Sequence, residues 1–97
     1  MFLYVIGSKD GPQKIGFSQD VEKRLSSIQT GNPNRLEIYF KQEVPKDRVR
    51  LMEKQIHKEI RHQKISGEWF NLTPEEAKQE VEFCVIRYLE DPLLGKY

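Results

Sequence analysis

The apolar residues at the start of the chain predict a β-hairpin. Residues 2–6 form a short continuous apolar run, which is typical of a strand covered on both faces. The stretch 9–12 then reads Lys-Asp-Gly-Pro, a combination that strongly favours a turn. We therefore expect residues 14–17 to form the returning strand of the hairpin.

A helical period replaces the strand pattern after this hairpin. Ser18 is suited to cap a helix, and Val21, Leu25 and Ile28 recur at the spacing of one buried helix face. Gly31 follows, and glycine commonly ends a helix. The pattern therefore predicts a first helix between Ser18 and Gly31.

Residues 36–41 return to a period of two, with Leu36, Ile38 and Phe40 at the apolar positions. Such alternation is typical of a strand with one buried face. We therefore predict a third strand here, with these three side chains on its buried face.

Two further helices complete the predicted fold. One covers about residues 45–61, and the other starts at the capping box of residues 73–76, Thr-Pro-Glu-Glu. The apolar side of the last helix holds Ala77, Val81, Cys84, Val85 and Tyr88. Asp-Pro at 91–92 is predicted to end it, so that residues 1–90 form one domain and residues 91–97 a short C-terminal tail. The order β-β-α-β-α-α predicts a small α+β domain with a three-stranded sheet.

Charged residues interrupt the apolar faces of two predicted helices. Glu53 falls inside the apolar arc of the second helix, and His57 lies at the edge of that arc. Arg24 falls inside the apolar arc of the first helix. Burying an isolated charge is costly even after relaxation. The pattern therefore predicts a buried Arg24–Glu53 ion pair, two side chains that extend to the rim, or a functional site.

The predicted hairpin contains two further residues of interest. Tyr4 lies in the middle of the first strand, where a tyrosine is usually a core residue with a hydrogen-bonded hydroxyl. Gly16 lies in the facing strand, where glycine is explained by a bulge, by helix packing, or by a group that must approach the backbone closely.

Composition narrows the class of protein. The 97 residues fit one domain, and 37% hydrophobic and 32% charged residues suit a small soluble one. The single Cys84 excludes an intramolecular disulfide and a thiolate metal cluster, and the apolar start is too short for a signal or membrane segment. A cytoplasmic location is therefore expected. The net charge is +1, but basic residues crowd between Lys46 and Lys64, which favours either a phosphate-binding face or a solvated one.

The order of these motifs resembles that of the GIY-YIG nuclease superfamily. The matching residues are Leu3-Tyr4-Val5-Ile6, Lys14-Ile15-Gly16-Phe17-Ser18, Arg24, Gly31-Asn32-Pro33, Glu53 with His57, and Gly67-Glu68-Trp69-Phe70. The similarity runs from Leu3 to about Tyr88, and it is greatest to the compact phage and bacterial branch, in which K-I-G often replaces the second signature. The resemblance implies a three-stranded antiparallel sheet flanked by helices, with the site on one sheet face.

The resemblance also implies roles for individual residues. Glu53 would bind one divalent metal, Mg²⁺ or Mn²⁺, while Arg24 and Tyr4 match the arginine and the first tyrosine of the family. Lys14 replaces the second tyrosine of the family, and Asn71 is the nearest candidate for its late asparagine. DNA is the expected partner, and no membrane partner is expected.

These assignments predict a metal-dependent endonuclease that hydrolyses DNA phosphodiester bonds. Tyr4 would act as general base and Arg24 would stabilise the phosphate. His57 would relay protons or orient a water, or it would be an ordinary histidine on the helix surface. The predicted substrate-binding residues are Lys14, Gly16, Arg24 and Asn71. The alternatives are a catalytically weak nucleic-acid-binding domain that keeps the fold, and an interaction domain with a structural Arg24–Glu53 pair.

Overall fold

A computed structural model describes residues 1–90 of the chain. Its elements are β1 (Phe2–Gly7), β2 (Gln13–Ser18), α1 (Val21–Thr30), β3 (Glu37–Glu43), α2 (Val49–Glu59), the 3₁₀ turn η1 (Arg61–Gln63), β4 (Lys64–Ser66), β5 (Trp69–Phe70) and α3 (Pro74–Glu90). The predicted tail at 91–97 and the predicted helix end at 91–92 lie outside the described residues.

The α+β class is confirmed, but the prediction of a three-stranded sheet was wrong. The sheet has five strands in the order β3-β1-β2-β5-β4, and every neighbouring pair is antiparallel. The two additional strands, β4 and β5, contain three and two residues, too few to produce a recognisable period of two. Gly67, with φ of 54°, lies in the turn that joins them.

Strand β3 departs from the predicted alternation because it contains a bulge. Val5 of β1 lies opposite Phe40, whereas the next residue, Ile6, lies opposite Ile38, so Tyr39 is the extra residue. Ile38 consequently packs on one side of the sheet and Phe40 on the other. The expectation that Ile38 and Phe40 share one buried face was therefore wrong.

Two helix starts also differ from the prediction. The carboxylate of Asp20, rather than Ser18, caps α1, since it accepts a hydrogen bond of 3.0 Å from the backbone N–H of Lys23. Helix α2 begins at Val49, because the segment from Pro45 precedes it as a turn. The capping box of α3 is confirmed: the backbone N–H of Thr73 donates to Glu76 Oε1 at 2.9 Å, and that of Glu76 to Thr73 Oγ1 at 3.1 Å.

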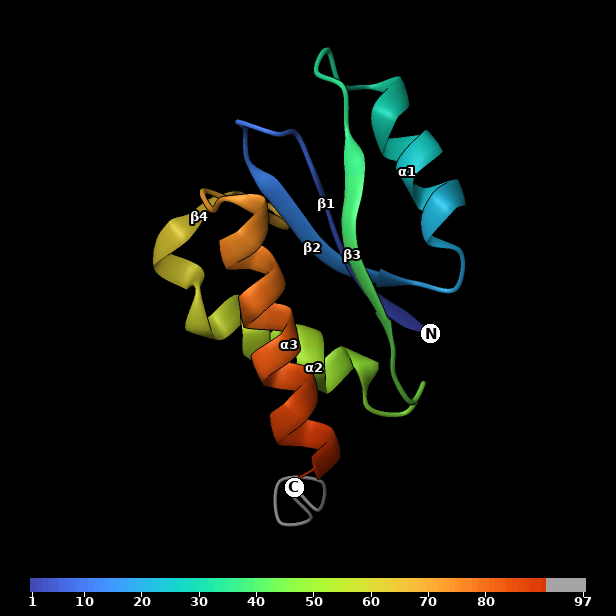
Figure 1. Cartoon of the computed structure of the whole chain (residues 1–97), viewed down its shortest axis with the longest axis vertical. Coiled ribbons are helices and arrows are strands. Elements are labelled where there is room, and N and C mark those ends of the chain that lie inside the picture. The colour runs from blue at the N-terminus through green and yellow to red at the C-terminus, as the bar shows by residue number, and fades with distance from the viewer. Residues whose placement is uncertain (91–97) are drawn as a thin grey trace.

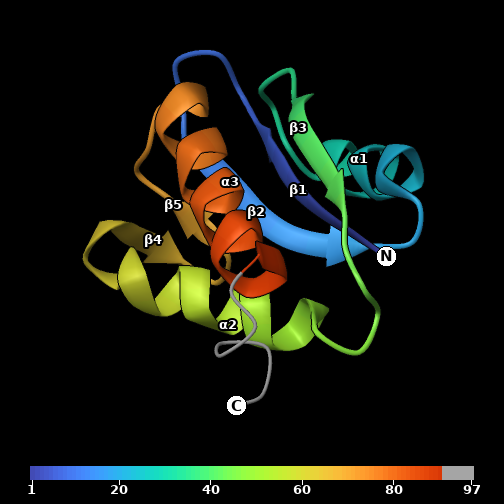
Figure 2. The ribbon, with the colours of Figure 1, turned by 60° about the horizontal axis from the view of Figure 1, so that its bottom comes forward.

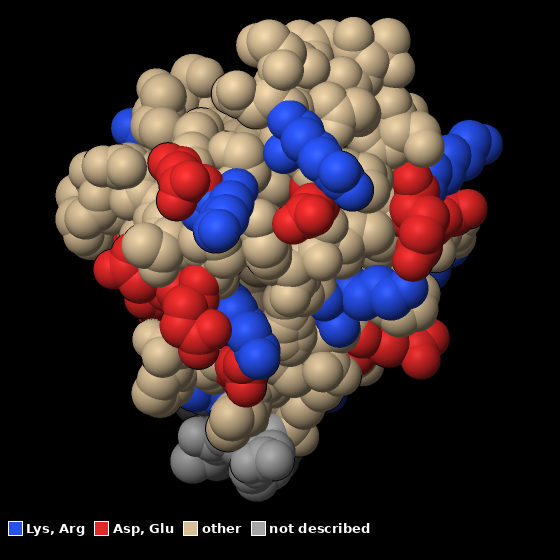
Figure 3. Space-filling view, turned by 45° about the horizontal axis from the view of Figure 1, so that its top comes forward, with Lys and Arg blue, Asp and Glu red and all other residues tan. Residues whose placement is uncertain are grey.

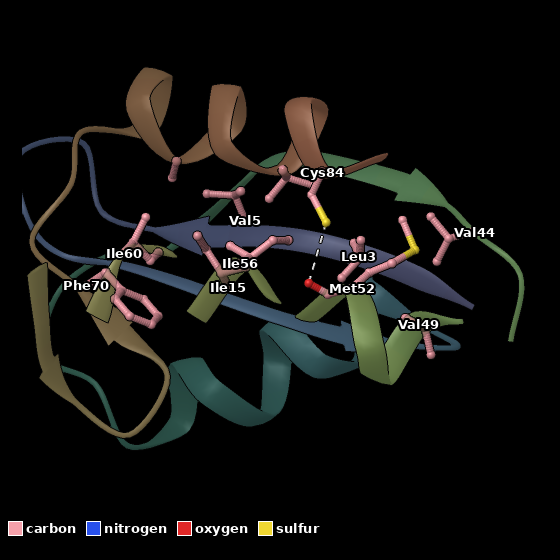
Figure 4. Close-up of a cluster of buried hydrophobic side chains, with 12 residues drawn as sticks. Leu3, Val5, Ile15, Val44, Val49, Met52, Ile56, Ile60, Phe70 and Cys84 are labelled. Carbon is pink, nitrogen blue, oxygen red and sulfur yellow. Dashed lines mark hydrogen bonds between the residues drawn. The ribbon is translucent and has the colours of Figure 1, made fainter. Parts of the chain in front are cut away.

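Helices cover both faces of the sheet (Figure 1, Figure 2). Helices α2 and α3 pack on one face around a larger apolar cluster that includes Leu3, Val5, Met52 and Phe70 (Figure 4). Helix α1 packs on the other face around a smaller cluster that includes Tyr4 and Val21. Alternate residues of β1 therefore belong to different cores, which explains its continuous apolar run.

A sulfur hydrogen bond joins the two helices of the larger cluster. The Cys84 thiol on α3 donates to the backbone carbonyl of Met52 on α2, with an Sγ–O distance of 3.5 Å (Figure 4). None of the described helices is both long and apolar enough to cross a membrane.

Candidate functional site

The register of the hairpin brings Tyr4 and Gly16 together. These two residues lie opposite each other in the β1–β2 ladder, and Ile6 lies opposite Lys14. Tyr4 is 1% exposed. A Cβ atom built on Gly16 would lie 2.6 Å from the Tyr4 hydroxyl oxygen and 3.1 Å from Glu68 Oε2. Of the explanations for a glycine within this strand, the structure favours close approach: the Tyr4 hydroxyl occupies the space where a side chain would be.

We expect Gly16→Ala to destabilise the fold, because the new methyl group would push against a buried ring. Inserting a methyl group into a well-packed site costs about 1–3 kcal/mol. Gly31→Ala is the matched control, since a Cβ at Gly31 meets nothing within 4 Å and its φ of −100° suits alanine. Urea unfolding of both variants measures the difference. Equal stability of the two variants would contradict the close packing of Tyr4 against Gly16.

Lys14 lies beside this pair and is held from two sides. Its ammonium Nζ lies 3.0 Å from Glu68 Oε2, and the side chains of Lys14 and Glu68 are 17% and 39% exposed. The same Nζ lies 5.7 Å from the ring centroid of Trp69, within the range of a cation–π contact. Lys14 and Trp69 are also partners in the β2–β5 ladder, which fixes the geometry.

The sequence prediction overlooked Glu68 as a site residue. Its carboxylate borders Gly16 and binds Lys14, and its charge raises the pKa of both Tyr4 and Glu53. The stretch Gly67-Glu68-Trp69-Phe70 was part of the family resemblance, but only as an ordered motif. No periodicity marks a residue in a turn between strands of three and two residues.

Helix α2 reaches the site around the edge of β2. Strand β5 pairs with β2 only at Gln13 and Lys14, so no strand pairs with this edge of β2 from Ile15 onward. The His57 ring of α2 lies at this edge instead, and its Nε2–H donates to the Ile15 carbonyl at 2.8 Å. The ring also lies 5.0 Å from Phe70 between centroids. His57 therefore anchors α2 to the sheet.

Glu53 lies one helical turn before His57 and is half-buried. Burial, and next the charge of Glu68, raise the pKa of the Glu53 carboxyl to about 7, while Lys14 and Arg50 act to lower it. Glu53 is thus electrostatically coupled to the residues around Gly16, although α2 packs mainly on the opposite face of the sheet.

Arg24 is exposed, in contrast to the expectation that it points into the apolar arc. It lines an open hollow of about 610 Å³ together with Phe17, Ser18, Lys23 and Ser27. Among the described residues no Arg24–Glu53 ion pair is present, so the predicted buried pair is not formed.

The Tyr4 hydroxyl is the group on which these charges act together. Burial raises its pKa to about 12, and the charges of Glu68 and Glu53 raise it too, while Arg24 lowers it. Tyr4 is therefore protonated at neutral pH in the resting protein. Arg24 is the cation that favours the ionised form.

Asn71 is not brought to this site. It is exposed and lines a separate hollow with Lys9, Pro12 and Thr73 beside the β1–β2 turn. Its backbone N–H donates to the Gln63 carbonyl at 2.7 Å. The structure therefore gathers Tyr4, Lys14 and Gly16 around Glu68 and places His57 at the adjacent edge of β2. Glu53 and Arg24 act on this cluster through their charges, and Asn71 lies outside it.

Comparison with known proteins identifies a domain family. No curated protein and no solved structure matches the chain. The model of the T5orf172 domain matches residues 1–85, which include the whole sheet and every site residue described above. This domain is phage-associated and is found in the context of GIY-YIG and HNH-like endonucleases, so it indicates a nuclease-like or DNA-binding role. Because the match covers most of its length, the chain belongs to the T5orf172 domain family.

Proposed function

We propose that this protein is a metal-dependent endonuclease of the GIY-YIG type that hydrolyses DNA phosphodiester bonds. The observation that carries the proposal is the cluster at Gly16, where the Tyr4 hydroxyl lies beside Glu68 and Glu68 pairs with Lys14. The charges of Glu53 and Arg24 act on the same Tyr4 hydroxyl. Family membership adds a nuclease-like or DNA-binding role. A tyrosine, two cations and a half-buried carboxylate together suit the handling of a phosphate and a metal.

Glu53 fits a divalent cation such as Mg²⁺ or Mn²⁺. The described residues contain no group of three or more His, Cys, Asp or Glu side chains that could hold a metal, so Glu53 would be a single anchoring ligand. Mg²⁺ is commonly bound in this way, through one or two carboxylates, waters and substrate phosphate. The raised pKa of Glu53 reflects poor solvation and a neighbouring negative charge, both of which a cation would relieve. When bound, the metal would supply positive charge that stabilises the leaving oxygen.

The cationic side chains would hold the substrate. The Arg24 guanidinium can donate two parallel hydrogen bonds to the non-bridging phosphate oxygens, and its exposed position in an open hollow leaves room for them. Lys14 adds a point charge beside Glu68, whose carboxylate borders the space over Gly16 that the Tyr4 hydroxyl occupies. A phosphate there would compete with the Glu68 carboxylate for the Lys14 ammonium.

Tyr4 would act as the general base once ionised. It would take a proton from the water whose oxygen attacks phosphorus while the bond to the leaving oxygen breaks. His57 would have a supporting role, because its Nε2–H is fixed by the Ile15 carbonyl. In neutral His57 the Nδ1 atom is then the nitrogen that can accept a proton.

A nucleic-acid-binding domain with little catalysis is the second candidate. The observation that favours it is the pKa of Tyr4, which burial raises to about 12. A Tyr4 hydroxyl that stays protonated can donate a hydrogen bond to a phosphate but cannot take a proton from water.

Plasmid cleavage separates the two candidates. We expect supercoiled plasmid to be nicked or linearised by the purified protein with Mg²⁺ or Mn²⁺, and to stay intact when a chelator is added. Intact plasmid in the presence of metal, together with salt-sensitive DNA binding, would support the second candidate. Neither cleavage nor binding would contradict both.

A further inference from the structure

The surface of α2 is strongly asymmetric. Its buried face holds Val49, Met52 and Ile56. At about 100° per residue, Glu53 and His57 lie on one side of that face. Moving outward on the same side, the helix presents Arg50, Lys54 and Lys58, and Arg61 follows in η1; all four are exposed.

The other side of α2 has a different character, because it faces α3. There Glu59 Oε1 lies 2.7 Å from the Arg87 guanidinium of α3 and 3.0 Å from the amide nitrogen of Gln55. The cations of α2 are therefore not distributed around the helix. They are concentrated on the side that borders the candidate site.

The four cations Arg50, Lys54, Lys58 and Arg61, here named the basic ridge, succeed one another at spacings of four, four and three residues. On a helix surface, side chains four residues apart are neighbours about 5–6 Å apart. Arg61 joins the row from η1, where its guanidinium donates to the Lys58 carbonyl at 2.7 Å. None of the four forms an ion pair with an acid among the described residues. By contrast, the face in Figure 3 shows Lys and Arg side chains interspersed with Asp and Glu.

The first cation of the ridge also interacts electrostatically with a residue of the candidate site. The charge of Arg50 acts on the carboxyl of Glu53, one turn away. A row of unneutralised cations that begins beside the proposed phosphate site has the form of a surface for a longer polyanion. A DNA strand offers such a polyanion, with phosphates at regular intervals along its axis.

We propose that the basic ridge of α2 binds the DNA backbone next to the phosphate that is cleaved. This inference rests on the proposed function and extends it, since it gives the path that the bound DNA follows away from the cleaved phosphate. The ridge contributes phosphate contacts without reading bases, so its contribution is independent of sequence.

Salt-dependent DNA binding tests the ridge. Lys54→Gln/Lys58→Gln leaves Glu53, His57 and the buried face intact. Binding to a labelled DNA duplex is measured by fluorescence anisotropy in the presence of chelator at several salt concentrations. We expect the fall of log K with log salt concentration to be less steep in this variant, by about 1.8 in slope, because each lost phosphate contact removes about 0.9.

The matched control is Lys9→Gln/Arg35→Gln, which removes the same charge from two exposed cations that line one hollow at the β1–β2 turn. Figure 1 shows this turn near the top of the molecule and α2 in its lower half. The control should keep the wild-type slope, and both variants should keep the wild-type melting temperature. A wild-type slope in Lys54→Gln/Lys58→Gln, or equal loss in both variants, would overturn the proposed ridge. Failure of the wild-type protein itself to bind DNA would instead overturn the proposed function.

Discussion

Glu53→Gln is expected to abolish metal-dependent cleavage while the protein stays folded. The amide keeps the shape of the side chain but removes the negative charge that would hold the cation. Plasmid cleavage over a range of Mg²⁺ concentrations measures the loss. Glu59→Gln is the control on the same helix, because Glu59 binds Arg87 of α3 rather than the site. Full cleavage by Glu53→Gln would exclude Glu53 as the metal ligand.

The same variant should be more stable than the wild type in metal-free buffer at pH 8. The folded pKa of Glu53 is raised to about 7 from an ordinary value of 4.5, so the folded state binds more protons between these values. Stability is therefore lost as pH rises through this window. Since half-burial leaves solvent screening, we expect Glu53→Gln to recover about 1–2 kcal/mol.

Glu59→Gln should show the opposite sign. The hydrogen bond from Gln55 and the contact with Arg87 lower the pKa of Glu59, so its charge stabilises the fold above its unfolded pKa. Removing that charge should therefore destabilise the protein at pH 8. A large loss of melting temperature in metal-free Glu53→Gln would mean that Glu53 is part of a structural pair, contrary to the geometry described above.

Tyr4→Phe is expected to slow cleavage by about 10²–10⁴ at nearly unchanged DNA affinity. The variant keeps the ring that packs in the smaller cluster and loses only the hydroxyl beside Gly16. Arg24 and Lys14 would still hold the phosphate. Single-turnover rates and anisotropy on the same duplex separate the effect on rate from the effect on binding.

The pH dependence gives a second measurement of this role. Because the pKa of Tyr4 is raised to about 12 in the resting protein, the wild-type rate should rise with pH across the whole accessible alkaline range. The rise should vanish in Tyr4→Phe. Tyr39→Phe is the matched control, because Tyr39 packs against the larger cluster whereas Tyr4 belongs to the smaller one on the other face of the sheet. It should cleave normally, and near-normal cleavage by Tyr4→Phe would remove Tyr4 from the mechanism.

Local patterns predicted most of the regular structure. The β1–β2 hairpin, the apolar stripe of α1 and the capping box of α3 all appear where residues close in sequence determine them. The errors occurred where the deciding interaction is distant. Strands β4 and β5 become strands only by pairing with each other and with β2, and the bulge at Tyr39 is visible only against its partner β1.

For the candidate site, the sequence by itself determined which residue types were available and on which elements they lie. Glu53 and His57 stood out because they interrupt or border the apolar face of one helix. Tertiary structure decided which of these residues meet. It brought Lys14 against Glu68, kept Arg24 in solvent rather than in an ion pair with Glu53, and left Asn71 in another hollow. The physical reason is that helical and strand periods describe only which side of its own element a residue occupies. How α2 passes the edge of β2, and how a short turn places Glu68 beside Gly16, depend on packing between distant segments.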